Sequence, residues 1–219
     1  MPFRHPLSLA IAGFLTLSSL PARPSALGIV LAAKHVHLNT TAVTVGATVY
    51  DGDQFSTETG GMLRLRSGTA GLELAEESAI RMQNPSNGAP GVEVQLDKGT
   101  LAFRSERVVS LVVIAREASI RPAADTRTVA QITVTSPKEL RVCARRGALQ
   151  FSYRGETETL AEGKSYRVIL DPPNNGPKEE PLPPAKFPKG FKIVIIGEAA
   201  AVVALGIYEW REPESPDRP

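Results

Sequence analysis

Between residues 27 and 170 the sequence alternates apolar and polar residues, and this period of two constrains the fold more than any other feature. Three runs show it most clearly: Met62 to Arg66 (MLRLR), Val92 to Leu96 (VEVQL) and Leu149 to Arg154 (LQFSYR). Such alternation places one set of side chains on a buried face and the other in water, as in a β-strand. No long helical period interrupts it. The region is therefore predicted to be an all-β domain.

Glycines punctuate these runs where turns need a positive φ or close backbone approach. A polar pair followed by a glycine recurs at Gly68, Gly99 and Gly147, which suggests one kind of hairpin used several times. The dense apolar run from Val108 to Ile114 has the β-branched content of a strand buried on both faces. We expect about ten to twelve short strands in a sandwich, a roll or a short β-helix.

Overall charge argues against a general attraction to polyanions. The chain has 25 basic and 23 acidic residues, a formal net charge of +2, and no basic run with interleaved aromatics. Aromatic residues make up only 5%, which gives little material for stacking on bases or sugars. We therefore expect no nucleic-acid partner.

Two terminal segments predict export and membrane attachment. The uncharged stretch of 14 residues from Leu7 to Leu20 suits the core of a signal peptide within residues 1–26, with a buried helix or an uncleaved anchor as alternatives. Residues 171–190 contain seven prolines in twenty residues, typical of a semi-rigid linker. Residues 191–210 follow as an expected transmembrane helix, with a helix packed on the domain as the alternative, and 211–219 as a short polar tail.

Within this expected helix, Gly197 and Ala201 form a small-xxx-small pair beside Glu198, the single charged residue between Ile193 and Tyr208. Small residues allow helices to approach closely, and a carboxyl group in a membrane prefers a partner. The three residues are therefore candidate helix-packing positions for self-association, although glycine and alanine are also simply common in such helices.

Candidate sites for chemistry are few. Asp51 and Asp53 could suggest calcium but fit a capped turn better, because an EF-hand needs further ligands at fixed spacing. The group Glu73, Glu76 and Glu77 reads as a solvated turn. His35 and His37 could be half of a metal site, but no third ligand is evident.

The single cysteine, Cys143, lies in an alternating run and is expected to be a buried apolar residue without a disulfide partner. No nucleotide-binding, hydrolase or metalloprotease motif is present. We expect no catalytic, cofactor-binding or metal residues.

An ordered set of segments resembles the FecR domain, a module of the bacterial cell envelope. The resemblance covers residues 27–170, and the order of the segments carries it more than any single motif. The segments are Val45–Thr57, Met62–Arg66, Leu72–Met82, Leu96–Phe103, Ile132–Pro137, Arg146–Phe151 and Leu160–Tyr166.

The resemblance implies a non-enzymatic periplasmic β domain for signalling or protein binding, held at the inner membrane. The best-known members also carry a cytoplasmic segment that binds a sigma factor, and the sequence before Leu27 reads instead as a signal peptide. We therefore expect an envelope protein as the partner, reached through strand edges or loops. The alternative is a module that binds envelope polysaccharide, which would need an aromatic-lined groove.

Overall fold

The computed structural model describes residues 25–86, 88–106, 111–172 and 190–198, and its regular structure is entirely β-strand. The all-β prediction is thus confirmed for this part of the chain. The strands are β1 (Ala26–Leu38), β2 (Thr41–Ala42), β3 (Thr48–Tyr50), β4 (Gln54–Ser67), β5 (Ala70–Leu74), β6 (Ala79–Gln83), β7 (Val92–Ser105), β8 (Leu111–Ala115), β9 (Ala118–Pro122), β10 (Thr128–Ser136), β11 (Glu139–Arg146), β12 (Leu149–Tyr153), β13 (Glu156–Leu160), β14 (Lys164–Leu170) and β15 (Phe191–Glu198).

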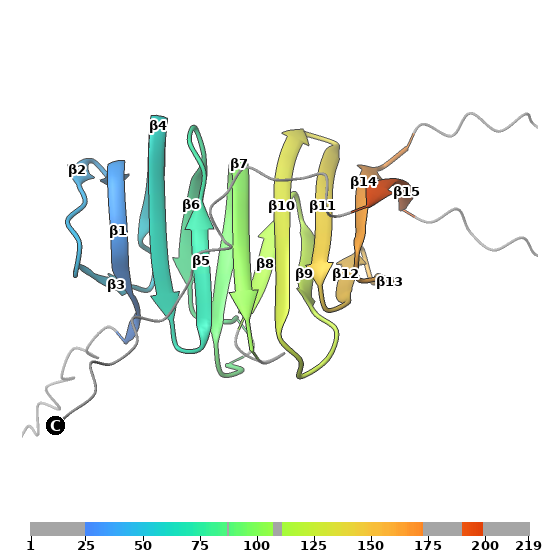
Figure 1. Cartoon of the computed structure of the whole chain (residues 1–219), viewed down its shortest axis with the longest axis horizontal. Helices are drawn as coiled ribbons and strands as arrows, with labels where there is room; N and C mark the ends of the chain where they lie inside the picture. Colours follow the sequence, from blue (N-terminus) through green and yellow to red (C-terminus); the bar gives the residue numbers. More distant parts are fainter. Residues whose placement is uncertain (1–24, 87, 107–110, 173–189, 199–219) are drawn as a thin grey trace, which may run out of the picture.

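Strand pairing arranges these elements in two facing layers (Figure 1). Layer 1 runs β2, the end of β1, the start of β4, β6, the start of β7, β8, β9, β12 and β13. Layer 2 runs β3, the start of β1, the end of β4, β5, the end of β7, β10, β11, β14 and β15. Every described pair is antiparallel except β7 with β8. The result is a sandwich in which β1, β4 and β7 belong to both layers.

The three shared strands bend where their backbone leaves the ordinary β region. His35 in β1, Gly60 in β4 and Gly99 in β7 all have positive φ, of 48°, 68° and 80°. The neighbouring Gly61 lies so close to β1 that a Cβ there would meet the His35 carbonyl oxygen at 2.7 Å. Glycine is needed at Gly61 and Gly99 because a Cβ at either position would meet the backbone of a neighbouring segment.

Ser78 ties the bend together from the β5–β6 connection. Its side chain is fully buried. The Ser78 hydroxyl donates to the carbonyl of Glu76 at 2.9 Å and accepts from the amide of Thr100 at 2.8 Å. The Ser78 amide donates to Thr57 Oγ1 at 2.9 Å. Buried polar groups are stable only with such partners, and Ser78 has them. We call the contact of Ser78 with the bends of β4 and β7 the corner.

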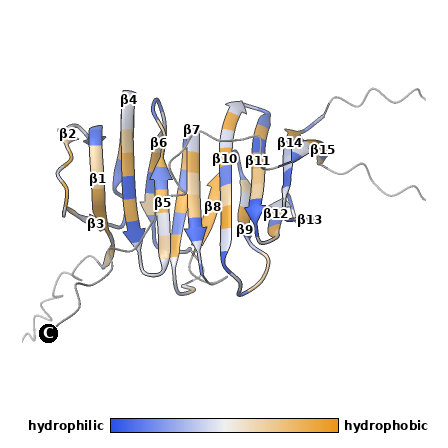
Figure 2. Cartoon of the chain, viewed as in Figure 1, coloured by the Kyte–Doolittle hydropathy of each residue, from blue (hydrophilic) through white to orange (hydrophobic). Residues whose placement is uncertain are grey.

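The core lies between the two layers and consists of the inward residues of alternating strands. Figure 2 shows the alternation as bands of opposite hydropathy along each arrow. The largest fully buried side chains include Phe55, Phe103 and Phe151, and Cys143 is also buried, as expected. In β8 only alternate residues are buried, because Val112 and Ile114 point outward and are half-buried. The expectation of burial on both faces is therefore wrong for its described part, 111–114.

The repeated glycine pattern does not form one kind of hairpin, and that prediction is wrong for two of its three cases. Gly68 does turn a hairpin, between β4 and β5. Gly99 instead bends β7 within a single strand. Gly147 connects β11 in layer 2 to β12 in layer 1, which do not pair with each other. A glycine between polar residues signals a change of direction, but tertiary packing decides which kind.

The helix expected over 191–210 begins in the structure as a strand. Phe191–Glu198 forms β15 and pairs with β14 from Leu170↔Phe191 to Lys164↔Glu198. Four consecutive β-branched residues, Ile193 to Ile196, favour a strand there. Within the described residues no helix is long and apolar enough to cross a membrane. Residues 199–210 of the expected helix and the polar tail 211–219 lie outside the described ranges.

Two other predicted segments fall mostly outside the described residues. Of the expected signal peptide, 1–26, only Ser25 and Ala26 are described, and Ala26 already belongs to β1. Of the expected linker, 171–190, the two ends are described, and the amide of Asp171 donates to the carbonyl of Gly190 at 2.9 Å. The two ends of this segment therefore meet on the domain.

Candidate functional site

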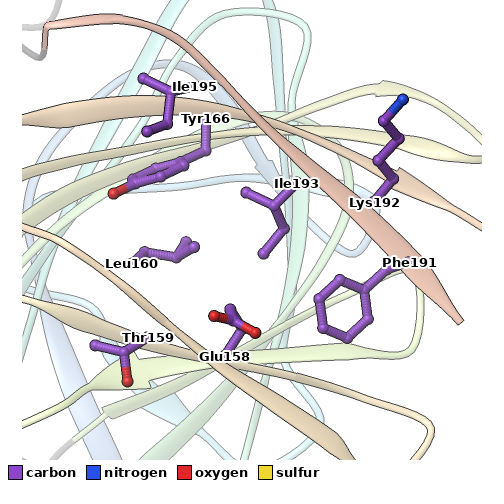
Figure 3. Close-up of a pocket in the computed structure, with 8 residues that line it drawn as sticks. All are labelled: Glu158, Thr159, Leu160, Tyr166, Phe191, Lys192, Ile193 and Ile195. Carbon is purple, nitrogen blue, oxygen red and sulfur yellow. The ribbon is translucent and has the colours of Figure 1, made fainter. Parts of the chain in front are cut away.

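One end of the sandwich is open, and a pocket of about 510 Å³ lies there between the edges of the two layers. β13 is the outer strand of layer 1 and β15 is the outer strand of layer 2. Figure 3 shows Ile195 beside Tyr166, its partner in the register, with Leu160 and Ile193 lining the space next to them. The complete lining is Glu158, Thr159, Leu160, Tyr166, Phe191, Lys192, Ile193 and Ile195.

Phe191 closes the inner side of the pocket. It is buried, and its ring lies edge-on to Phe151 with centroids 5.0 Å apart, and to Tyr153 at 6.4 Å. Edge-to-face pairs of this kind add to the stabilisation from area burial. Phe191 therefore anchors the start of β15 to layer 1, Ile193 packs partly buried against the core, and Val194, Ile195 and Ile196 are exposed.

Tyr166 holds the two layers together on the other side of the pocket. Its hydroxyl accepts from the amide of Ala161 at 2.8 Å and donates to the carbonyl of the same residue at 3.3 Å. The turn after β13 is thereby fixed to β14. The pocket has a rigid floor, and its outer wall is the exposed part of β15.

The surface of β15 is strongly apolar for an exposed strand. Ile195 is 61% exposed, Ile196 46% and Val194 37%. Among the described strands β15 pairs with β14 alone, so its other side offers backbone groups to an incoming strand. An apolar edge strand beside an apolar pocket is an arrangement suited to binding an extended peptide.

A polar cluster borders this end of the sandwich. Asp171 accepts from the Tyr153 hydroxyl at 3.1 Å and from the Arg154 guanidinium at 2.5 Å. The same guanidinium lies 5.1 Å from the centre of the Tyr153 ring. Burial, and secondly the hydrogen bond to Asp171, raise the pKa of the Tyr153 hydroxyl above its ordinary value. The cluster fixes the end of β14 to the β12–β13 turn.

The residues singled out for helix packing lie on β15 or beyond the described residues. Gly197 pairs with Ser165, and Glu198 pairs with Lys164, whose ammonium lies 3.5 Å from the carboxylate. Ala201 is outside the described ranges, so helix packing by these residues stays a prediction.

The candidate acidic and histidine groups have structural partners. Asp53 accepts from the Tyr50 amide at 2.8 Å and Asp51 from the Asn84 amide at 2.7 Å, which is the capped turn that was expected. His37 lies 2.8 Å from a Glu58 carboxylate oxygen, and His35 occupies the bend of β1. No group of three possible metal ligands occurs in the described part of the chain.

Glu76 and Glu77 lie exposed in a turn, as predicted, whereas Glu73 lies buried in β5. Glu73 is buried against Arg64, with an N–O distance of 2.8 Å. Glu76 accepts from the Gly60 amide at 2.7 Å, and Glu77 accepts from a side-chain hydroxyl on β4 at 3.2 Å. Their carboxylates are thus used by β4 at its bend.

The open-end pocket was not identified from the sequence. The sequence predicts a helix for the residues of β15, and helical spacing places Ile193 on a different face from Phe191 and Ile195. The available signal was their period of two, which continues the pattern of the preceding domain.

No known protein family matches this sequence, and no curated protein matches it either. Two crystal structures of a protein described as a "putative anti-sigma factor from Parabacteroides distasonis ATCC 8503" resemble the fold, one at 2.50 Å and one at 1.65 Å resolution. The first matches with a TM-score of 0.45 and 14% identity over 57% of this chain and 56% of that chain. The second matches with a TM-score of 0.44 and 14% identity over 57% of each chain. The match thus spans little more than half of those chains.

Proposed function

We propose that this chain is a non-enzymatic protein-binding module of the bacterial envelope, related in role to FecR domains, that holds an extended segment of a partner protein at its open end. The observation that carries this proposal is the exposed apolar strand β15 beside the pocket between β13 and β15. Edge strands are usually protected by charged side chains, by proline or by a covering segment, because their unpaired backbone groups can pair with another chain. β15 keeps three exposed apolar residues in a row instead.

The geometry favours binding by strand addition. An incoming strand pairs its backbone with β15 and points alternate side chains into and away from the pocket. The lining from Leu160, Tyr166 and Ile193 suits apolar side chains at the inward positions. A partner segment with apolar residues at every second position is therefore the expected ligand.

A polysaccharide-binding role is less well supported. Sugar sites need exposed aromatic faces, and six of the seven described aromatic side chains are buried. Tyr50 is the exposed one, and it lies on β3, at the end of layer 2 opposite to β15.

Envelope location rests on the sequence, through the apolar N-terminal segment and the resemblance to FecR domains. The transmembrane helix stays a prediction: residues 191–198 form β15, and residues 199–210 lie outside the described part of the chain. Protease added to intact spheroplasts should cleave the domain if it faces the periplasm, and full protection would contradict this location.

The binding proposal is tested by site-specific photo-crosslinking in cells. A benzoylphenylalanine at Ile195 should form an adduct with another polypeptide, and the matched control at Val45, 65% exposed on the other end of the domain, should not. Adding Ile193→Asp, which places a charge in the pocket, should abolish the adduct at Ile195. Equal adducts at both positions, or an adduct that survives Ile193→Asp, would contradict strand addition at this site.

A further inference from the structure

The outer face of layer 2 concentrates positive charge that is not visible in the linear sequence. Strand register places seven residues directly opposite one another across this face, forming a central row. The central row is Arg64, Glu73, Ala102, Gln131, Cys143, Ser165 and Gly197. Because side chains alternate along a strand, residues two positions away in each strand share the same face.

Arginines flank the central row on both sides. On one side the register aligns Arg66, Arg104 and Arg146, with Gly71 and Val129 between them. On the other side Arg141 lies directly opposite Arg167. With Arg64 the three rows hold six arginines; against them stand Glu73, Glu106 and Glu139, which pair with Arg64, Arg104 and Arg167, so the net charge is 6 − 3 = +3. The whole chain carries only +2.

The outer face of layer 1 carries no such excess. Its paired positions include Arg81 and Arg121 together with Glu93, and its other outward residues are mainly glutamine, serine and threonine. The positive charge is therefore a property of one face and not of the surface in general.

Two of these arginines form no salt bridge with a described carboxylate. Arg64 is paired with Glu73, Arg104 with Glu106 and Arg167 with Glu139, which also attracts Arg141. Arg66 and Arg146 are exposed and have no such bridge within the described residues. A face that keeps an excess of arginines over carboxylates in the free protein is complementary to an anionic surface.

The floor between the arginine rows consists of small residues and is broad. Ala102, Cys143 and Ser165 are buried beneath the longer side chains, and the Ser165 hydroxyl has no hydrogen-bond partner. Seven strands at about 4.8 Å spacing give a face roughly 29 Å wide. Charges spread over such a face fit an extended anionic surface better than a single small anion.

We propose that the outer face of layer 2 docks on an anionic phospholipid membrane. Val194, opposite Arg167 on the outermost strand of this layer, adds an exposed apolar side chain to the face. Basic residues beside exposed apolar side chains strengthen binding to anionic lipids. The proposal rests on the proposed function only for the envelope location.

The test is flotation of the full chain with two kinds of vesicle: neutral vesicles of phosphatidylcholine alone, and anionic vesicles of phosphatidylcholine with 30% phosphatidylglycerol. The chain should float with the anionic vesicles only and be released at high salt, which screens charges. The triple variant R66E/R141E/R146E should lower the partition coefficient at least about a hundredfold, from about fivefold for each of the three basic residues lost. The matched variant K98E/R116E/R121E makes the same charge change at positions away from this face and should bind within about threefold of the parent.

Three outcomes would overturn the proposal: equal flotation with neutral vesicles, equal loss in both triple variants, or binding of soluble polyphosphate through these arginines without any vesicle binding. Circular dichroism and thermal melting of both variants confirm that they fold. Photo-crosslinking at Ile195 is independent of the lipid, so failure of membrane docking and failure of partner binding can be told apart.

Discussion

Replacing Gly99 by alanine tests whether β7 passes from one layer to the other through the corner described above. The φ of Gly99 is +80°, a region in which an alanine costs about 1 to 2 kcal/mol. A Cβ at this position would lie 2.6 Å from the Ser78 Cα and closer still to its hydroxyl. Since the backbone itself blocks the new atom, the corner must open, and overpacking of this kind costs about 1 to 3 kcal/mol.

Opening the corner also weakens the hydrogen bonds that Ser78 makes with Glu76 and Thr100, each worth about 1 kcal/mol. We therefore expect Gly99→Ala to lower the free energy of unfolding by about 4 kcal/mol, a large share of the 5 to 15 kcal/mol typical of a domain. Gly52→Ala is the matched control, because Gly52 has a φ of +86° with nothing within 4 Å of its Cβ position. It should cost about 1 kcal/mol. Urea unfolding followed by circular dichroism measures the free energy of unfolding of both variants. Equal decreases would refute the close contact between Gly99 and Ser78.

Two further predictions concern the open end. Phe191→Ala should lower the free energy of unfolding by about 3 kcal/mol, since the ring is buried against Phe151 and Tyr153, whereas Ile195→Ala should change it by less than about 0.5 kcal/mol; similar urea midpoints for the two variants would show that β15 is not docked. The raised pKa of Tyr153 makes its contribution to stability complete below its unfolded pKa of about 10 and lost as the pH rises through the higher folded value. Melting temperatures between pH 8 and 11 should therefore fall less steeply for Tyr153→Phe than for the parent. An unchanged slope would contradict the contribution of the Tyr153 hydroxyl to this pH dependence.

The class of fold could be predicted from the sequence because burial imposes a period of two on every half-buried strand. Met62 to Arg66 illustrates this, with Leu63 and Leu65 buried and Arg64 and Arg66 facing outward. The bends within β1, β4 and β7 could not be predicted, since a glycine such as Gly99 serves equally in a hairpin or in a bent strand. Only the contact with Ser78, 21 residues earlier, decides between them.

The C-terminal strand shows where local patterns mislead. Residues 191–198 are apolar enough for a membrane helix, and the following alanines extend that pattern. The decision for a strand comes from the free edge of β14 and from the space beside Phe151 that Phe191 fills. Neither is visible in the segment itself.

The basic face was missed for a related reason. The sequence contains no basic run, and its net charge is close to zero. Strand alternation and register gather arginines from β4, β7, β11 and β14 on one face, where they outnumber the glutamates that pair with them. Charge patterning in a β protein therefore has to be evaluated after register is known.

The most direct test of the account is whether β15 pairs with β14 in the full chain, because both the open-end site and the extent of layer 2 depend on it. Arg167 and Val194 are direct partners in the register, and cysteines at such positions can form a disulfide. In a Cys143→Ala background, Arg167→Cys with Val194→Cys should oxidise readily, whereas Lys34→Cys with Val194→Cys should not, because Lys34 lies on β1 at the far end of layer 2. Rapid disulfide formation in the first pair alone is the predicted result. Equal oxidation of both pairs, or none in the first, would contradict the strand and the partner site built on it.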